Sequence, residues 1–302
     1  MELIPHDINV DFVGKRLFFV LLSVGINLLS IILLLMWGFN YGVDFAGGTV
    51  VEARFQQPTT LEAIHQSIEK LTLEDLTIQD LGGDNKTYLL RFKQDEQNID
   101  TSSTAVRTAL TTTFGEAVQI LRVEAVGAKV SSRLRQQGFL AVTFATLFMG
   151  IYMAFRFEWR FGVGAVVALI HDVLVVTGVL ILTQTPFDLT VLAAMLTVVG
   201  FSVHDTIIIS DRVRENLRKF RRSNLAEVIN RSINETLSRT VITSGTALMV
   251  LISLYVIGGH VIRPFALTMI VGFITGTYSS VYIAAPIVLY FERSLTPQRK
   301  AA

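Results

Sequence analysis

The sequence contains no cysteine, so it can form no disulfide bond, no thiolate metal site and no cysteine nucleophile. Charged residues are also scarce, at 17% of the 302 residues, compared with about 25% in a typical soluble domain. The formal net charge of +1 gives no whole-chain signal for nucleic acid or an acidic partner. We find no nucleophile beside a base, no metal-ligand cluster and no phosphate-binding loop. The sequence therefore predicts neither an enzyme nor a bound cofactor or metal.

Hydrophobic residues make up 51% of the chain, and its mean hydropathy is +0.52. They are concentrated in six stretches, each long enough to cross a hydrocarbon core about 30 Å thick. The stretches are 17–37, 138–155, 161–182, 189–210, 240–258 and 265–291. The first is longer than the core of a signal peptide and is followed by no clear cleavage site, so we interpret it as an uncleaved span. The sequence predicts a membrane protein with six transmembrane helices.

Basic residues are concentrated on one side of the predicted bundle. They precede the first span, lie between spans two and three and between spans four and five, and follow span six. They are Lys15, Arg16, Arg156, Arg160, Arg212, Arg214, Arg218, Lys219, Arg221, Arg222, Arg231, Arg293, Arg299 and Lys300. In the short loops of the other side, Arg263 is the only basic residue. Because Lys and Arg favour cytoplasmic loops, both termini are predicted to be cytoplasmic and the long loop after span one to lie outside.

The basic cytoplasmic segment 211–239 carries apolar residues at helical spacing. They are Leu225, Val228, Ile229, Ile233 and Leu237. This pattern predicts an amphipathic helix along the cytoplasmic face. Two interpretations stay open: the segment binds anionic lipid headgroups or a partner, or it is a solvated connector that packs on the bundle.

Residues 38–137 read as a separate mixed α+β domain between a first region (1–37) and a five-helix region (138–302). Strands are predicted at 49–55, 76–81, 86–93 and 117–126, and helices at 61–71 and 101–114. Thr59 and Glu62 fit a capping box for the first of these helices. A hairpin turn is predicted at Gly82-Gly83-Asp84-Asn85. The order β-α-β-β-α-β is the ferredoxin-like pattern.

Ionisable residues inside spans are costly and mark functional sites by default. Span three contains His171 and Asp172, span four contains His204 and Asp205, and Arg239 stands at the entry to span five. At a rise of about 1.5 Å per residue, Asp205 and Arg239 reach a similar depth, roughly 24 and 28 Å from the outer ends of their spans. We therefore predict that they pair, and that protonation of the carboxylate breaks the pair.

The alternative for this pair is a static salt bridge between the two spans. The two histidines and Asp172 also have a second interpretation, because they could serve only as polar contacts between helices. Gly272 and Gly276 form a G-x-x-x-G pattern in span six, which predicts close helix packing. Pro286 predicts a kink in the same span.

Three motifs resemble a known family. Residues 41–49, with Gly42, Asp44, Phe45, Gly47 and Gly48, are similar to a segment shared by SecD and SecF. Residues 200–206 and 211–216 resemble the fourth-span signature of SecF, and residues 234–240 resemble its entry to span five. The chain thus resembles the SecF branch of the SecD/SecF family of protein-export membrane proteins. Its single outer domain of modest size is also more similar to SecF than to SecD.

The resemblance implies a fold of the resistance-nodulation-division superfamily in the bacterial inner membrane. Such a subunit pairs with SecD, commonly with YajC, and acts beside the SecYEG channel. The complex uses the proton motive force to move unfolded preproteins outward. Proton-passage roles carry over to Asp205 and Arg239, and a partner carboxylate is expected from SecD. The family often has another polar residue where this chain has His204, so whether His204 titrates stays open.

Two other functions are weighed against this one. A proton-coupled small-molecule exporter of related fold usually has two six-span halves and two large loops, whereas this sequence predicts one of each. A scaffold that only stabilises SecD needs no proton chemistry, and substitution of Asp205 distinguishes it from a coupled subunit.

Overall fold

The computed structural model describes residues 9–71, 73–81, 83, 85–93, 99–220 and 223–295. The chain divides into two compact units. The first, the helical unit, comprises residues 1–40, 140–186 and 190–302, and the second, the sheet unit, comprises residues 41–139 and 187–189. Parts of the predicted turn (Gly82, Asp84) and four of the basic residues (Arg221, Arg222, Arg299, Lys300) lie outside the described residues.

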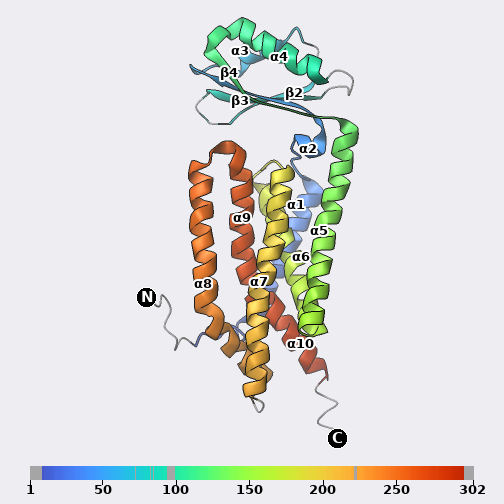
Figure 1. The fold of residues 1–302 in the computed structure, drawn as a ribbon, viewed down its shortest axis with the longest axis vertical. Helices are drawn as coiled ribbons and strands as arrows, with labels where there is room; N and C mark the ends of the chain where they lie inside the picture. Colours follow the sequence, from blue (N-terminus) through green and yellow to red (C-terminus); the bar gives the residue numbers. More distant parts are fainter. Residues whose placement is uncertain are drawn as a thin grey trace. The chain divides into compact units, whose positions relative to one another are not determined.

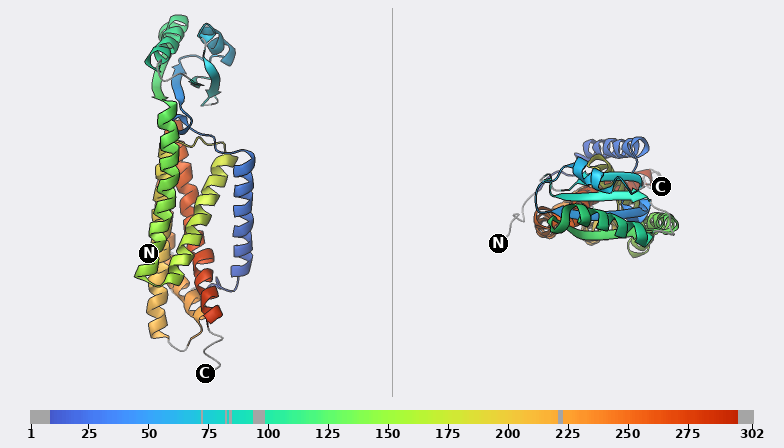
Figure 2. Two further views of the ribbon diagram at one scale, coloured as in Figure 1. Left: turned by 90° about the vertical axis from the view of Figure 1, so that its right-hand side faces the viewer. Right: turned by 90° about the horizontal axis from the view of Figure 1, so that it is seen from above.

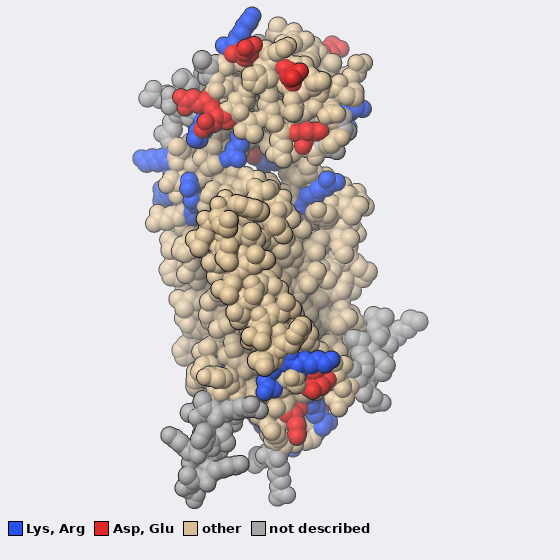
Figure 3. Space-filling model, turned by 180° about the vertical axis from the view of Figure 1, so that it is seen from behind, with Lys and Arg blue, Asp and Glu red and all other residues tan. Residues whose placement is uncertain are grey.

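The six predicted spans are present as helical passages in the described part of the chain (Figure 1). They are α1 (Arg16–Met36), α5 (Ala128–Arg156), α6 (Trp159–Leu182), α7 (Leu189–Lys219), α8 (Leu225–Ile257) and a last passage that begins with α9 (Gly259–Ser279). This last passage continues through a π-helical turn, Ser280–Ala284, into α10 (Ala285–Leu295). We call the end of the bundle where α1 begins and α10 ends the terminal end. Figure 3 shows a broad band without charged side chains, with Lys and Arg at its borders, as a bilayer requires.

Three passages form the interior of the helical unit. About half of the most apolar window is buried in α6, in α7 and in the last passage, compared with 11–17% in α1, α5 and α8. Leu169 of α6, Met153 of α5 and Val203 of α7 pack in one core cluster. Phe201 of α7 stacks on Phe273 of α9, with ring centroids 3.6 Å apart. Helix α6 lies between α1 and α9 (Figure 2). The acidic residues described below lie on α6 and α7, two of the more buried helices.

The prediction of one amphipathic helix at 211–239 is wrong. α7 continues to Lys219, α8 begins at Leu225, and the two helices meet at a short connection. Asn224 ends the connection because its side chain accepts a hydrogen bond from the Ala226 N–H, as an N-cap residue does. The apolar residues Ile229 and Ile233 are buried in one cluster with Ile209 and Val213 of α7. The apolar face therefore packs against α7 in a helical hairpin.

The π-helical turn lies directly before Pro286, where a kink was predicted. A proline has no N–H to donate, and π turns are common where the regular helical ladder is interrupted. The structure therefore assigns the irregularity of the last passage to Ser280–Ala284.

The sheet unit has the predicted strand and helix order. Its elements are α2 (Val43–Ala46), β1 (Gly48–Phe55), α3 (Leu61–Ile68), β2 (Glu74–Asp80), β3 (Thr87–Lys93), α4 (Ile99–Phe114), a 3-10 turn (Gly115–Ala117) and β4 (Val118–Val126). The sheet is antiparallel, in the order β2-β3-β1-β4. Both α3 and α4 cover one face of it (Figure 1), where Ile64, Leu90 and Leu110 are fully buried. Whether the unit belongs to the ferredoxin-like fold stays a prediction.

One detail of the capping prediction is wrong. The N-cap of α3 is Thr60, whose hydroxyl accepts a hydrogen bond from the Ala63 N–H, whereas Thr59 donates to the Gln57 carbonyl. Thr60 is the N-cap because its backbone has the extended conformation that an N-cap residue needs.

Candidate functional site

Asp172 lies in the centre of the helical unit. Its carboxylate has hydrogen-bond partners on α7, on α9 and on its own helix, α6. Its Oδ2 accepts hydrogen bonds from Ser202 of α7 (2.6 Å) and Ser279 of α9 (2.8 Å). Its Oδ1 lies 3.1 Å from Nδ1 of His171, the preceding residue on α6. Both carboxylate oxygens thus have polar partners although the side chain is almost fully buried. This arrangement meets the requirement that a buried carboxyl group be hydrogen-bonded.

Asp205 has a different environment. It lies three residues after Ser202, on the same face of α7, and its residue is fully buried. Oδ2 accepts a hydrogen bond from Thr277 of α9 at 3.1 Å, whereas Oδ1 is buried without a hydrogen-bond partner. The Thr277 hydroxyl also lies 2.9 Å from the Ser244 hydroxyl of α8. A short polar chain therefore joins α7, α9 and α8 at Asp205.

Helix α9 contributes a hydroxyl group to both carboxylates. Its backbone lies close to α7, because a Cβ atom added at Gly272 would be 2.1 Å from a methyl group of Val198. A Cβ atom added at Gly276 would be 3.0 Å from Cβ of Ser202. These glycines bring Thr277 and Ser279 within reach of the acidic residues. We call Asp172, Ser202, Asp205, Ser244, Thr277 and Ser279 the polar layer.

The predicted ion pair between Asp205 and Arg239 is absent among the described residues. The Asp205 carboxylate faces α9 and has Thr277 as its partner, whereas Arg239 lies exposed on α8. His204 is also exposed, because it is the neighbour of a residue that points inward. Equal depth along the bundle places two residues at the same height, but the direction in which each helix presents its side chains is independent of depth.

Two residues next to the polar layer each have a buried polar atom without a hydrogen-bond partner. These atoms are Nε2 of His171 and the hydroxyl oxygen of Thr240, which lies four residues before Ser244 on α8. Together with Oδ1 of Asp205, they can exchange a hydrogen bond with a water molecule or a proton donor. In the described residues, no group of three or more His, Asp or Glu side chains could hold a metal ion.

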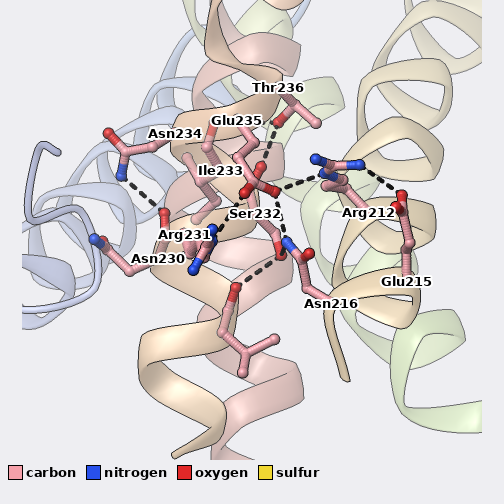
Figure 4. Close-up of polar contacts among 11 residues, drawn as sticks. Arg212, Glu215, Asn216, Asn230, Arg231, Ser232, Ile233, Asn234, Glu235 and Thr236 are labelled. Carbon is pink, nitrogen blue, oxygen red and sulfur yellow. Dashed lines mark hydrogen bonds and ion pairs between the residues drawn. The ribbon is translucent and has the colours of Figure 1, made fainter. Parts of the chain in front are cut away.

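A second polar cluster joins α7 to α8 at the terminal end (Figure 4). Glu235 of α8 accepts hydrogen bonds from Arg212 (2.6 Å) and Asn216 (2.6 Å) of α7 and from Arg231 of its own helix (2.9 Å). Asn216 is buried and also donates to Ser232. We call these residues the hairpin cluster. It holds α7 and α8 in one register relative to each other, on the terminal side of the polar layer.

The glycine-rich motif 41–49 forms the entry to the sheet unit. Gly42 donates its N–H to the Phe187 carbonyl, and the Asp44 carboxylate accepts the Leu189 N–H at 2.9 Å. Gly47 and Gly48 have positive φ angles, and a Cβ at Gly48 would lie 2.6 Å from the Phe92 carbonyl oxygen. Only glycine tolerates both conditions. The motif thus holds residues 187–189 and starts strand β1.

The serine and threonine partners of the carboxylates were not predicted from the sequence. Ser202, Thr277 and Ser279 lie in apolar spans as hydroxyl residues with no motif of their own. A search for hydroxyl side chains at helical spacing from Gly276 would have found Ser279, three residues further on, since small-residue faces and hydroxyl groups occur together at close helix contacts. It would not have found Thr277, which directly follows Gly276.

Comparisons with known proteins agree on one family. Residues 105–294 match the family described as protein export membrane protein SecD/SecF, C-terminal, and residues 33–59 match the SecD/SecF GG motif. A protein translocase subunit SecF from Calditerrivibrio nitroreducens is 39% identical over 298 residues, which cover 98% of each chain. The SecF of Rickettsia rickettsii is 37% identical over 291 residues, covering 96% of this chain and 94% of the relative.

Solved structures of SecDF are also similar. The crystal structure of SecDF from Thermus thermophilus, described as a translocon-associated membrane protein, has a TM-score of 0.85 and 32% identity. The match covers 96% of this chain but only 40% of that one. SecDF in a super-membrane-facing form has a TM-score of 0.67 and 31% identity, and the match covers 41% of its length. The chain therefore spans about two fifths of each of these two SecDF structures.

Proposed function

Because the chain belongs to the SecD/SecF family of protein-export membrane proteins, we propose that it is the SecF subunit of a SecDF-type protein translocation complex. We place it in the bacterial inner membrane as a multi-pass protein, with both termini in the cytoplasm and the sheet unit outside. The near-complete coverage of SecF relatives and the partial coverage of SecDF support a subunit that needs a SecD partner.

We further propose that the subunit couples the proton motive force to export. The observation that carries this proposal is the buried carboxyl group of Asp205, with one oxygen bonded to Thr277 and the other without a partner. An ionised carboxylate only accepts hydrogen bonds, whereas a protonated one also donates. Uptake of one proton therefore changes which hydrogen bonds join Asp205, Thr277 and Ser244. Because these residues belong to α7, α9 and α8, the change favours a different packing of the three helices.

In this mechanism Asp172 is the second acidic group of the polar layer, and His171 is its neighbour on α6. Ser202 connects the two carboxyl groups, because it donates to Asp172 from the α7 face that also carries Asp205. Arg239 acts without a direct ion pair: it precedes Thr240, whose buried hydroxyl lies one helical turn from Ser244. We propose that Arg239 stabilises negative charge at the Thr240 end of the row of hydroxyl groups formed by Thr240, Ser244 and Thr277. His204, which is exposed, would face the partner subunit.

The remaining parts of the proposal concern partners and fold. The expected partners are SecD, which would supply a further carboxylate, YajC, the SecYEG channel and an unfolded preprotein. We propose a fold of the resistance-nodulation-division type with a ferredoxin-like outer unit, for which the order β2-β3-β1-β4 is the support. The mechanism contains no catalytic step and needs no cofactor other than protons.

Export measured with and without a proton gradient tests the coupling. The variant is Asp205→Asn, which keeps the shape and the hydrogen-bond acceptor for Thr277 but cannot take up a proton. Asp211→Asn is the matched control, because Asp211 is an exposed carboxylate six residues further along the same helix. We expect Asp205→Asn to lose the gradient-dependent part of export, while the control keeps it and both variants still copurify with SecD.

The other outcomes have clear meanings. Full gradient-dependent export by Asp205→Asn, with SecD bound, would contradict the proton role and favour a scaffold. Normal export with altered drug resistance would favour the small-molecule exporter.

A further inference from the structure

The terminal end of the helical unit contains an apolar groove between the first helix, α6 and α10. Its volume is about 770 Å³, within the range of roughly 300–1,000 Å³ that is typical of ligand sites. Apolar side chains of all three helices line it: Leu17 and Val20, Val163 and Val167, Ile287 and Leu289. Among the described residues that line it, Arg16 is the only charged one, and Tyr290 and Phe291 complete its wall. The groove thus fits an alkyl chain with a polar group at one end.

A polar cavity of about 620 Å³ adjoins the groove, because Gly14 and Arg16 line both. The segment before α1 and the first turns of α8 form its walls. Its charged lining residues are Asp11, Arg16, Glu227, Arg231 and Glu235. Arg231 and Glu235 pair with each other at 2.9 Å, as part of the hairpin cluster. The charges left to meet a ligand are therefore the guanidinium of Arg16 and the carboxylates of Asp11 and Glu227.

Arg16 and Asp11 are held in place separately. Nη1 of Arg16 donates to the Val13 carbonyl at 2.9 Å, and Oδ1 of Asp11 accepts the Gly14 N–H at 2.7 Å. Among the described residues, no ion pair joins either side chain to an oppositely charged one. A partly buried guanidinium and two carboxylates thus present both signs of charge to one cavity. The complementary ligand carries both a negative and a positive group.

We propose that the groove and the adjoining cavity bind one membrane phospholipid with an ethanolamine headgroup. An acyl chain lies in the groove, the phosphate pairs with Arg16, and the ammonium donates to Asp11 and Glu227. A lipid with an anionic glycerol headgroup would leave both carboxylates without a cation. A choline headgroup cannot donate hydrogen bonds to them. The exposed aromatic residues Trp159 and Tyr290 lie on the same helices, as expected at the level of the headgroups.

Lipid retention measured by native mass spectrometry tests the proposal. The full-length protein, with any partner that copurifies, is placed in nanodiscs with equal phosphatidylethanolamine and phosphatidylglycerol, then released and weighed. Three variants address the three contacts: Arg16→Gln, Asp11→Asn (which can still accept the Gly14 N–H) and Val167→Trp, which fills the groove. Lys15→Gln and Val24→Trp are the controls, because both residues are exposed and neither lines the site.

We expect the wild-type protein to retain phosphatidylethanolamine preferentially. Arg16→Gln should lower its retention about tenfold, the loss expected for one charge-assisted hydrogen bond. Asp11→Asn should reduce the preference for ethanolamine over glycerol headgroups, and the controls should match the wild type. Retention that is unchanged in all three variants would overturn the proposal, as would equal retention of the two lipids. A groove found to hold a partner helix or the chain's own C-terminal segment would overturn it too.

Discussion

Asp172 and Asp205 lie in one layer but differ in their freedom to change protonation state. Asp172 has partners on both oxygens, from α6, α7 and α9. Asp205 has one oxygen without a partner and a single hydroxyl donor, Thr277, which also contacts Ser244. A group with an open acceptor can take up a proton without first breaking an existing hydrogen bond. This difference supports Asp205 as the group that changes and Asp172 as the group that orders the layer.

At the residue scale, Gly272 sets the distance between α7 and α9. We predict that Gly272→Ala destabilises the helical unit by about 1–3 kcal/mol, the usual cost of overpacking. The added Cβ would lie 2.1 Å from a methyl group of Val198, which is itself buried and cannot move aside freely. Detergent-induced unfolding monitored by circular dichroism measures the effect.

The control for this substitution is Gly245→Ala on α8, where no neighbouring atom lies within 4 Å of the new Cβ. It should be neutral, or stabilising by up to about 1 kcal/mol, since alanine favours helices. Val198→Ala should reduce the cost of Gly272→Ala in the double variant. Equal effects of the two glycine substitutions would argue against a close helix contact.

At the scale of elements, the hairpin of α7 and α8 also holds the segment before α1. The Asn230 side chain accepts hydrogen bonds from the N–H groups of Phe12 and Val13 and donates to the Val10 carbonyl. Asn234 adds a bond from the Val10 N–H. Because the segment forms no regular secondary structure, these two side chains take the place of a neighbouring strand.

We predict that Asn230→Ala increases amide hydrogen exchange at Phe12 and Val13 about tenfold, because each loses its acceptor. Mass-spectrometric exchange on the full-length protein measures this. Arg231→Ala is the matched control, since Arg231 is the next residue and its side chain pairs with Glu235 instead. Similar protection in both variants would show that other contacts hold the segment.

The elements show what sequence reasoning can and cannot supply. The length of the hydrophobic stretches was sufficient to predict the six helical passages. The alternation of apolar residues, together with turn signals, was sufficient to predict the order of strands and helices in the sheet unit. The segment 211–239 was misread because periodicity reports an apolar face but not what covers it, and here α7 covers it. The partner of Asp205 was misread because depth is a one-dimensional quantity, whereas a hydrogen bond also needs the right helix face.

At the scale of the whole molecule, the division into two compact units predicts separate responses to core damage. Leu90 is fully buried in the core of the sheet unit. We predict that Leu90→Ala destabilises this unit by about 2–5 kcal/mol, the usual cost of a leucine-sized cavity. Hydrogen exchange of the full-length protein should show lost protection in β1, β3 and α4 but unchanged protection in α6 and α7.

Leu121→Ala provides the control, because Leu121 lies on β4 with 44% of its surface exposed and should have a small effect. Lost protection that extends equally into α6 and α7 would mean that the two units unfold as one.

The position of α9 between both acidic side chains has a consequence for any spectroscopic measurement of protonation. Ser279 and Thr277 are two residues apart on this helix, so a displacement that lengthens one of their bonds also alters the other. Groups that interact through a shared helix titrate in macroscopic steps that belong to the pair when the interaction exceeds about one pK unit. The assignment of an infrared titration step to Asp205 therefore requires the same measurement on an Asp172→Asn variant.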